Sequence, residues 1–113
     1  MTSPRCLLAD DHPALTAAVS AYLTENGFEI VGPVPDGRRA MLLAASEQPE
    51  LALVDYRMPR LQGLELIRAL REASPGTRIA VYTAEGDEQL AGDALAAGAV
   101  AVVLKEAPLA LLR

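Results

Sequence analysis

Five short runs rich in valine, isoleucine, leucine and alanine alternate along the chain with segments whose apolar residues show helical spacing. Each run lies close to a turn-forming residue, which is typical of a β-strand. Strands that alternate with helices through short connections predict a parallel sheet with helices on both faces. The predicted strands are residues 5–9, 29–34, 51–55, 78–83 and 100–104.

The segments between these runs place apolar residues three or four positions apart, as on one face of an amphipathic helix. Turn formers mark their ends: Pro13 stands near the start of the first, Asn26-Gly27 follows it, and Asp36-Gly37 precedes the second. A fifth helix is predicted to begin near Ala107-Pro108 and to be cut short at Arg113, so we expect further sequence to follow. The apolar positions are Leu15, Val19, Tyr22 and Leu23 in the first helix, Leu64, Ile67 and Leu70 in the third, and Leu90, Ala94 and Leu95 in the fourth.

Composition limits the functions that this chain can have. Its 113 residues, 51% of them hydrophobic, are enough for one domain with a buried core, which we place at residues 1–113. The net charge of -5 argues against nucleic acid or an anionic membrane as a direct partner. The single cysteine, Cys6, excludes an intrachain disulfide. The longest apolar run, residues 94–104, is too short to span a bilayer, so we predict a cytoplasmic protein with no membrane partner.

Polar side chains that could carry chemistry follow or close four of the predicted strands. Asp10 and Asp11 follow the first, Asp55 and Thr83 close the third and fourth, and Lys105 follows the fifth. The carboxyl ends of parallel strands form the crevice in which ligands bind. Three carboxylates in one crevice repel one another and favour a hard divalent cation, for which Mg²⁺ is the candidate. A carboxylate is also a nucleophile towards phosphorus, and a threonine hydroxyl and a lysine ammonium can contact phosphate oxygens.

Each of these residues also has an ordinary structural explanation. An aspartate before a helix is commonly an N-cap or a turn former, threonine is common in strands, and a lone lysine is most often a solvated charge. We interpret His12 as a surface or helix-start residue rather than a metal ligand, because no second histidine or cysteine accompanies it. The functional interpretation therefore depends on the polar residues occurring together at four strand ends.

Five motifs carry a resemblance to a known family. They are Leu8-Ala9-Asp10-Asp11-His12-Pro13, Leu53-Val54-Asp55-Tyr56-Arg57-Met58-Pro59 followed by Gly63, Val81-Tyr82-Thr83-Ala84, Gly98-Ala99 and Lys105. Together they resemble the receiver domains of two-component response regulators over essentially the whole chain. The opening motif is similar to the NarL/LuxR-type branch. The resemblance implies a flavodoxin-like (CheY-like) doubly wound sheet with strand order 2-1-3-4-5.

The resemblance also implies roles for the strand-end residues. Asp55 would be the phosphoacceptor, and Asp11 and Asp55 would bind Mg²⁺ together with the backbone carbonyl of Arg57. Asp10 would help to hold the cation through a water molecule, and Thr83 and Lys105 would contact the phosphoryl oxygens.

The partners implied by the resemblance are a sensor histidine kinase, which donates the phosphoryl group, and DNA, which is contacted only through a C-terminal helix-turn-helix domain absent from these residues. The domain would catalyse only its own phosphorylation and slow dephosphorylation, so we do not expect an enzyme in the turnover sense. A homodimer stays an open alternative.

One position departs from the family pattern. Val102 stands where the family usually has Tyr or Phe, which places the usual coupling between Thr83 and an aromatic ring in doubt. Tyr82 does not replace that ring, because strand alternation directs it to the opposite face. A second hypothesis is therefore a pseudo-receiver that acts as a phosphorylation-independent interaction or dimerisation module. A phosphohydrolase is disfavoured, because Arg57 occupies the place of the usual second aspartate.

Overall fold

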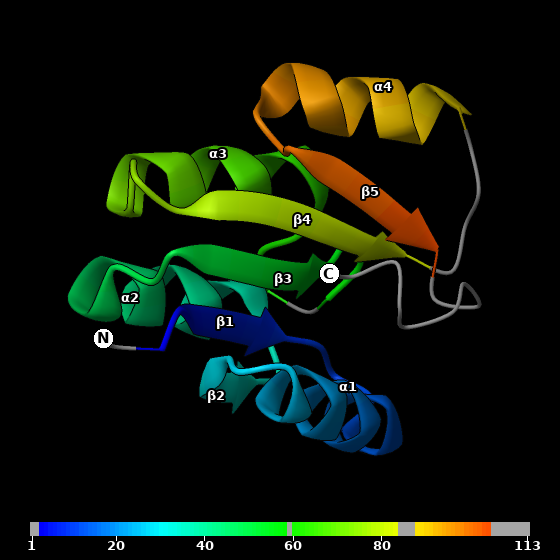
Figure 1. The fold of residues 1–113 in the computed structure, drawn as a ribbon. Helices are drawn as coiled ribbons and strands as arrows, with labels where there is room; N and C mark the ends of the chain where they lie inside the picture. The colour runs from blue at the N-terminus through cyan, green and yellow to red at the C-terminus, as the bar shows by residue number, and fades with distance from the viewer. Residues whose placement is uncertain (1–2, 59, 84–87, 105–113) are drawn as a thin grey trace.

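The computed structural model describes residues 3–58, 60–83 and 88–104, which form one parallel sheet with helices on both faces (Figure 1). The five strands lie in the order β2-β1-β3-β4-β5, as predicted. Their bounds are β1 Arg5–Ala9, β2 Glu29–Val34, β3 Leu51–Asp55, β4 Arg78–Thr83 and β5 Ala101–Leu104. The predicted start of the fifth strand was wrong by one residue, because Val100 donates to the Ile79 carbonyl but lies outside β5 with 58% of its surface exposed. Lys105 and the predicted fifth helix lie outside the described residues.

Four helices connect the strands: α1 Pro13–Glu25, α2 Gly37–Glu47, α3 Gly63–Ala73 and α4 Glu88–Ala97. Proline at the first position of α1 lacks only an N–H that the helix does not use there. Asp36 caps α2, and its carboxylate accepts a hydrogen bond of 2.8 Å from the Arg39 N–H. Within the described ranges, no helix is long and apolar enough to cross a membrane.

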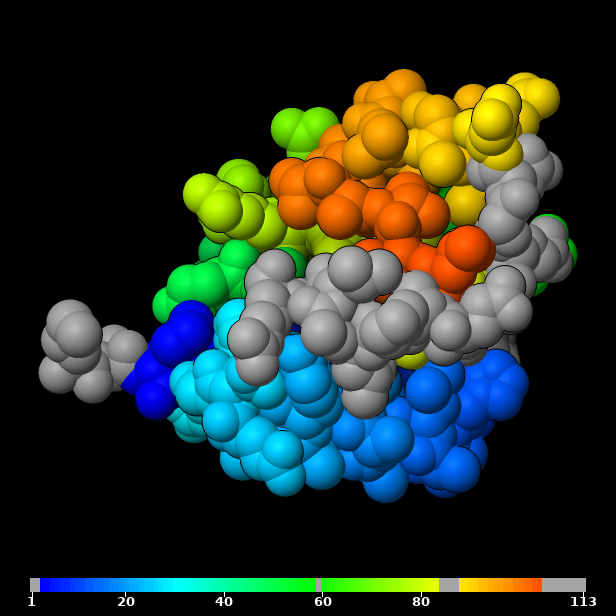
Figure 2. Space-filling model, turned by 45° about the vertical axis from the view of Figure 1, so that its right-hand side comes forward, coloured from blue at the N-terminus to red at the C-terminus, as the bar shows by residue number. Residues whose placement is uncertain are grey.

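The two faces of the sheet bury separate hydrophobic clusters, because alternate residues of each strand point to opposite sides. The helices α2, α3 and α4 cover one cluster, and α1 covers the other. In the space-filling view (Figure 2), α1 and β2, in blue to cyan, lie at one end of the molecule and α4 and β5, in yellow to orange, lie at the other. The first cluster includes Leu7, Val54, Leu66, Ile67, Leu70 and Val81; the second includes Cys6, Leu8, Val19, Leu23, Leu53 and Tyr82.

This division tests two predictions about side-chain direction. Tyr82 packs in the α1 cluster, whereas Val81 and Val102 pack in the opposite one, so the prediction that Tyr82 faces away from Val102 is confirmed. The predicted apolar face of the fourth helix was wrong at Leu95, which is 49% exposed while Ala94 is fully buried. Adjacent helical residues differ by about 100° in direction, so the two cannot share one narrow face.

Cys6 lies inside the α1 cluster with no exposed surface, and burial raises the pKa of its thiol from 9.0 to about 12. Above pH 9 the unfolded chain therefore loses this proton before the folded chain does, which favours unfolding. We expect the free energy of unfolding of the wild type to fall by about 1.4 kcal/mol more than that of Cys6→Ala between about pH 8 and pH 10. Urea denaturation of both proteins at the two pH values measures this difference. Parallel pH profiles would show that the buried thiol does not contribute.

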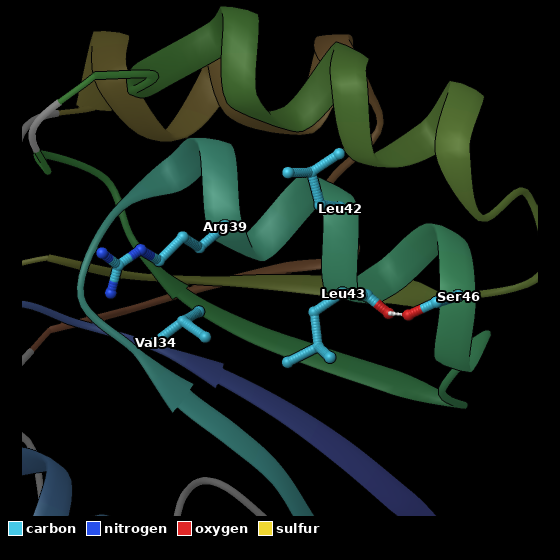
Figure 3. Close-up of a pocket in the computed structure, with 5 residues that line it drawn as sticks. All are labelled: Val34, Arg39, Leu42, Leu43 and Ser46. Carbon is cyan, nitrogen blue, oxygen red and sulfur yellow. Dashed lines mark hydrogen bonds between the residues drawn. The ribbon is translucent and has the colours of Figure 1, made fainter.

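A shallow hollow lies on the surface between α2 and the last residue of β2 (Figure 3). Val34, Leu42 and Leu43 supply aliphatic lining, and Leu42 is 56% exposed. The hydroxyl of Ser46 donates to the Leu43 carbonyl of the same helix at 3.1 Å, and Arg39 lines the remaining side. This lining offers apolar contact, and none of the described residues that form it carries a carboxylate, unlike the polar strand ends.

Candidate functional site

Strand register places Asp10 beside Asp55. In the parallel pair of β1 and β3, the last paired residues are Ala9 and Val54, so the next residue on each strand is an aspartate at the carboxyl edge of the sheet. Neighbouring strands lie about 4.8 Å apart, which brings two carboxylates close together. Both residues are buried, with 5% of Asp10 and 4% of Asp55 exposed.

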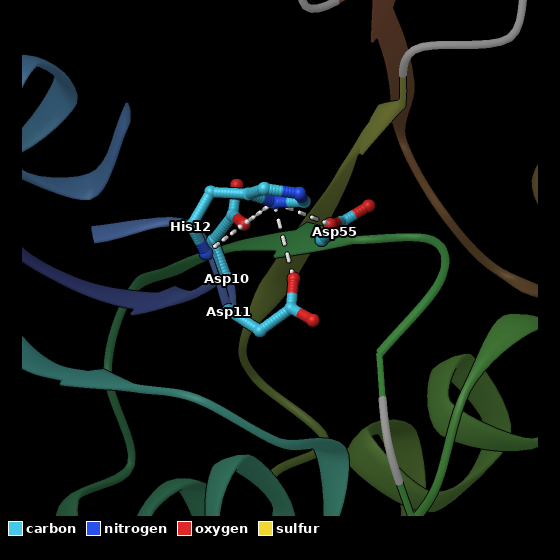
Figure 4. A group of neighbouring side chains, drawn as sticks. All are labelled: Asp10, Asp11, His12 and Asp55. Carbon is cyan, nitrogen blue, oxygen red and sulfur yellow. Dashed lines mark hydrogen bonds and ion pairs between the residues drawn. The ribbon is translucent and has the colours of Figure 1, made fainter. Parts of the chain in front are cut away.

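Asp11 and His12 complete a four-residue cluster at this edge (Figure 4). One potential ligand atom from each of Asp10, Asp11, His12 and Asp55 lies within 4.8 Å of the others. The Nδ1 atom of His12 lies 2.8 Å from Asp10 Oδ1, 3.1 Å from Asp11 Oδ1 and 3.8 Å from Asp55 Oδ2. The His12 ring is therefore directed at all three carboxylates, although 63% of its side chain is exposed.

Backbone donors orient the two buried carboxylates. The His12 N–H donates to Asp10 Oδ1 at 2.9 Å, and the Arg57 N–H donates to Asp55 Oδ1 at 3.2 Å. A buried carboxylate is destabilising unless hydrogen bonds or opposite charges compensate its lost hydration. These bonds therefore stabilise the two side chains in place and set the backbone of Arg57 beside Asp55.

Thr83 ends β4 at the same edge of the sheet and is 2% exposed. Asp55 pairs with Tyr82, so Thr83 stands one residue further along the strand next to Asp55. The Tyr56 N–H donates to the Tyr82 carbonyl at 3.2 Å and joins the start of the following loop to β4. Five of the predicted residues, Asp10, Asp11, Asp55, Arg57 and Thr83, thus lie at one edge, while Lys105 is outside the described part of the chain.

Comparison with known proteins identifies the family to which this arrangement belongs. The family model for the response regulator receiver domain matches residues 6–113. The chain belongs to this family. It is 37% identical over 101 residues to the nitrate/nitrite response regulator protein NarL of Escherichia coli, covering 88% of this chain and 47% of that protein. The receiver domain thus spans about half the length of the curated relatives that it matches.

Solved structures agree in fold and branch. The receiver domain of NarL from Mycobacterium tuberculosis has a TM-score of 0.91 and 30% identity, and covers 97% of this chain and 90% of its own. A Burkholderia pseudomallei response regulator, solved with a phosphorylated aspartic acid, a calcium ion and citrate, has a TM-score of 0.88 and 26% identity, with coverage of 96% and 64%. The present chain is therefore a receiver domain of the NarL/LuxR type.

The donor atoms of this receiver domain fit a divalent cation. Carboxylate oxygens are the ligands that Mg²⁺ and Ca²⁺ prefer, and three carboxylates meet here. Opposite ligands of an octahedral ion with bonds of about 2.1 Å are about 4.2 Å apart. The ligand atoms of the cluster lie within 4.8 Å of one another. Their longest separation therefore needs to shorten by only about half an ångström to fit such an ion, which small side-chain rotations supply.

The position of the His12 ring was missed by the sequence interpretation. His12 is the N-cap residue of α1, in agreement with a helix-start role, but its side chain makes no capping hydrogen bond. The extended backbone of this residue, at φ -106° and ψ 100°, accompanies a ring directed at the carboxylates instead. The available signal was its place directly after Asp10-Asp11 and before Pro13, where the chain turns from the strand into the helix.

The loop after Asp55 is held by packing that the motifs did not reveal. The Gly63 N–H donates to the Tyr56 carbonyl at 2.8 Å, and Met58 is 3% exposed within the hydrophobic cluster that α2, α3 and α4 cover. Gly37, the first residue of α2, lies against the backbone of Leu61 so closely that a Cβ atom there would be 1.8 Å from the Leu61 carbonyl oxygen. The N-terminus of α2 therefore supports the loop that begins at the candidate site.

Proposed function

We propose that this receiver domain is a phosphorylation switch in which Asp55 accepts a phosphoryl group. The observation that carries the proposal is the placement of the buried Asp55 carboxylate within 4.8 Å of ligand atoms of Asp10 and Asp11. Such a cluster can hold a cation next to a nucleophilic oxygen, and the cation reduces the charge repulsion that opposes attack on a phosphoryl group. The phosphorylated aspartic acid in the Burkholderia pseudomallei relative supports the same chemistry.

We assign the cation as Mg²⁺ and the donor as a phosphohistidine of a sensor kinase. Asp11, Asp55 and the backbone carbonyl of Arg57 would hold the cation directly, and Asp10 would hold it through a water molecule. When bound, the cation supplies charge neutralisation at the phosphoryl oxygens. The residues of the chain bind and orient the reacting groups, with Thr83 and Lys105 on the phosphoryl oxygens.

In the proposed transfer, an oxygen of Asp55 attacks phosphorus in line with the leaving imidazole. The new O–P bond forms as the P–N bond breaks, and the imidazole of the kinase leaves with the electron pair and takes a proton. Positioning and electrostatic stabilisation supply most of the rate in such reactions. The domain modifies only itself, so we do not propose an enzyme that turns over a separate substrate.

Reaction with a small phosphodonor tests this function. The chain is incubated with acetyl phosphate, with and without Mg²⁺, and intact mass and peptide mapping are then recorded. We expect one phosphoryl adduct per chain, formed only with the cation and located in the peptide that contains Asp55. An adduct independent of the cation, or located in another peptide, would overturn the assignment.

Removal of one cation ligand gives a second prediction for the site. Asp11→Asn is expected to weaken Mg²⁺ binding by about tenfold or more, because a neutral amide replaces a charged oxygen ligand. Isothermal titration with Mg²⁺ measures the effect. Asp93→Asn makes the same chemical change on the exposed surface of α4, and should bind Mg²⁺ like the wild type. Equal affinities for the two variants would remove Asp11 from the ligand set.

We further propose that phosphorylation controls a C-terminal helix-turn-helix domain, in keeping with NarL-type relatives about twice as long as this chain. DNA would be contacted only by that domain. A second candidate, a phosphorylation-independent interaction module, is favoured by Val102, which is half-buried beside Val81 where the family usually has an aromatic ring. Sedimentation of wild type and Asp55→Asn under phosphorylating conditions separates the two. A dimer that forms equally in both supports the interaction module.

A further inference from the structure

We propose that His12 is a ligand for the site cation through Nδ1, and that it gives this receiver site a preference for divalent transition metals, represented by Ni²⁺, over Mg²⁺. The inference rests on the cation site of the proposed function and adds a residue and a metal class to it. It starts from the position of the ring, since His12 is the single histidine of the chain and Nδ1 is directed at three carboxylates (Figure 4).

The distances around Nδ1 agree with a shared coordination sphere. Adjacent ligands of an octahedral ion with bonds of about 2.1 Å are about 3.0 Å apart, and opposite ligands are about 4.2 Å apart. The Nδ1 atom lies 3.1 Å from Asp11 Oδ1, which is an adjacent-ligand separation, and it lies at a hydrogen-bond distance of 2.8 Å from Asp10 Oδ1. Its distance of 3.8 Å from Asp55 Oδ2 falls between the two values. One ion bonded to Asp11 and Asp55 can therefore also reach Nδ1 after small side-chain rotations, with Asp10 held through a water as in the proposed function.

A cation bonded to these oxygens also leaves the ring only two positions. An ion about 2.1 Å from Asp11 Oδ1 and Asp55 Oδ2 can lie within bonding reach of Nδ1, and the ring then either binds the ion or turns away. The 63% exposure of the side chain leaves space for it to turn towards solvent. When the ring binds, Nδ1 presents its lone pair to the ion and Nε2 carries the proton.

The chemistry of the cation decides between these two positions. Mg²⁺ is a hard ion that takes oxygen ligands and retains several waters, so an imidazole nitrogen offers it little. Divalent transition metals bind imidazole nitrogen well, with affinity rising from Mn²⁺ to Ni²⁺. Asp11, Asp55, the Arg57 carbonyl and Nδ1 would take four positions of an octahedral ion and leave two, one for a phosphoryl oxygen and one for the water through which Asp10 is held. The nitrogen thus adds affinity for transition metals that the three aspartates alone do not supply.

Cation affinities of wild type, His12→Ala and His12→Gln test this inference. The proteins are prepared without a histidine tag, and each is titrated separately with Ni²⁺ and Mg²⁺ in a calorimeter. We expect both substitutions to weaken Ni²⁺ binding by about tenfold or more and to change Mg²⁺ binding by less than about twofold. Unchanged Ni²⁺ binding, or equal weakening of both cations, would overturn the inference.

Proton NMR distinguishes a His12 side chain that binds the metal from one that has only a structural role. Proton NMR of the Co²⁺-loaded wild type should contain one strongly shifted, exchangeable ring N–H signal, which His12→Gln lacks. Its absence from the wild type would also overturn the inference. The proposed function is tested separately by the Mg²⁺-dependent phosphoryl adduct on Asp55, in the wild type and in His12→Ala. If the adduct forms but Ni²⁺ binding does not depend on His12, only the metal preference is refuted. If the wild type forms no adduct, the proposed function is refuted.

Discussion

Asp55→Asn is expected to abolish phosphorylation by acetyl phosphate while leaving the domain folded. The amide cannot form the acyl phosphate, so intact mass spectrometry should show an adduct on the wild type and none on the variant. The same change removes one of three neighbouring carboxylate charges at the carboxyl edge of the sheet, and the carboxylate removed is a buried one. The free energy of unfolding in the absence of a cation should therefore stay equal or rise, because like charges in close contact are destabilising.

The control for this experiment is Asp93→Asn, which exchanges the same groups on the exposed surface of α4. It should be phosphorylated as the wild type is, with the same dependence on Mg²⁺. An adduct of undiminished yield on Asp55→Asn would place the acceptor on another residue. An Asp55→Asn variant that is unfolded by circular dichroism would contradict the expectation that its stability is equal to or higher than that of the wild type.

Gly37→Ala is expected to lower the free energy of unfolding by about 3 kcal/mol. This value is at the upper end of the loss of stability that overpacking usually causes. The added Cβ would lie 1.8 Å from the Leu61 carbonyl oxygen and 2.7 Å from its carbonyl carbon. Both contacts involve backbone, so α2 or the loop after β3 must shift to relieve them. Because this loop begins directly after Asp55, the yield of the phosphoryl adduct should fall as well. Urea denaturation and intact mass measure the two effects.

Gly92→Ala is the matched control. Gly92 lies in the exposed part of α4, and a Cβ there meets nothing within 4 Å. Alanine favours a helix interior over glycine by about 0.5–1 kcal/mol, so this variant should be more stable than the wild type. Equal stability of the two alanine variants would show that the approach of Gly37 to Leu61 is looser than the structure has it.

The fold could be predicted because the chain follows one consistent pattern. Four strands begin and end where the apolar runs do, and Pro13 and Asp36 mark helix starts through known end effects. The prediction failed where packing partners decide the outcome. Val100 still donates to the neighbouring strand yet lies outside β5, and Leu95 follows a buried Ala94 but is itself 49% exposed.

Most of the candidate site could be predicted for a related reason. The polar residues occur at the carboxyl ends of strands, and parallel pairing alone brings Asp10 next to Asp55. The direction of the His12 ring could not be predicted, because it depends on the backbone turn between β1 and α1. The approach of Gly37 to Leu61 joins segments that the sequence does not relate.

The central claim is that the ends of β1 and β3 hold a cation and a phosphoryl group together. A crystal structure of the chain with Mg²⁺ and beryllofluoride, which mimics a phosphoryl group, tests it most directly. We predict a beryllium atom bonded to a carboxylate oxygen of Asp55 and a cation bonded to oxygens of Asp11 and Asp55. Beryllofluoride bound at another residue, or a cation bound away from these two aspartates, would contradict the account.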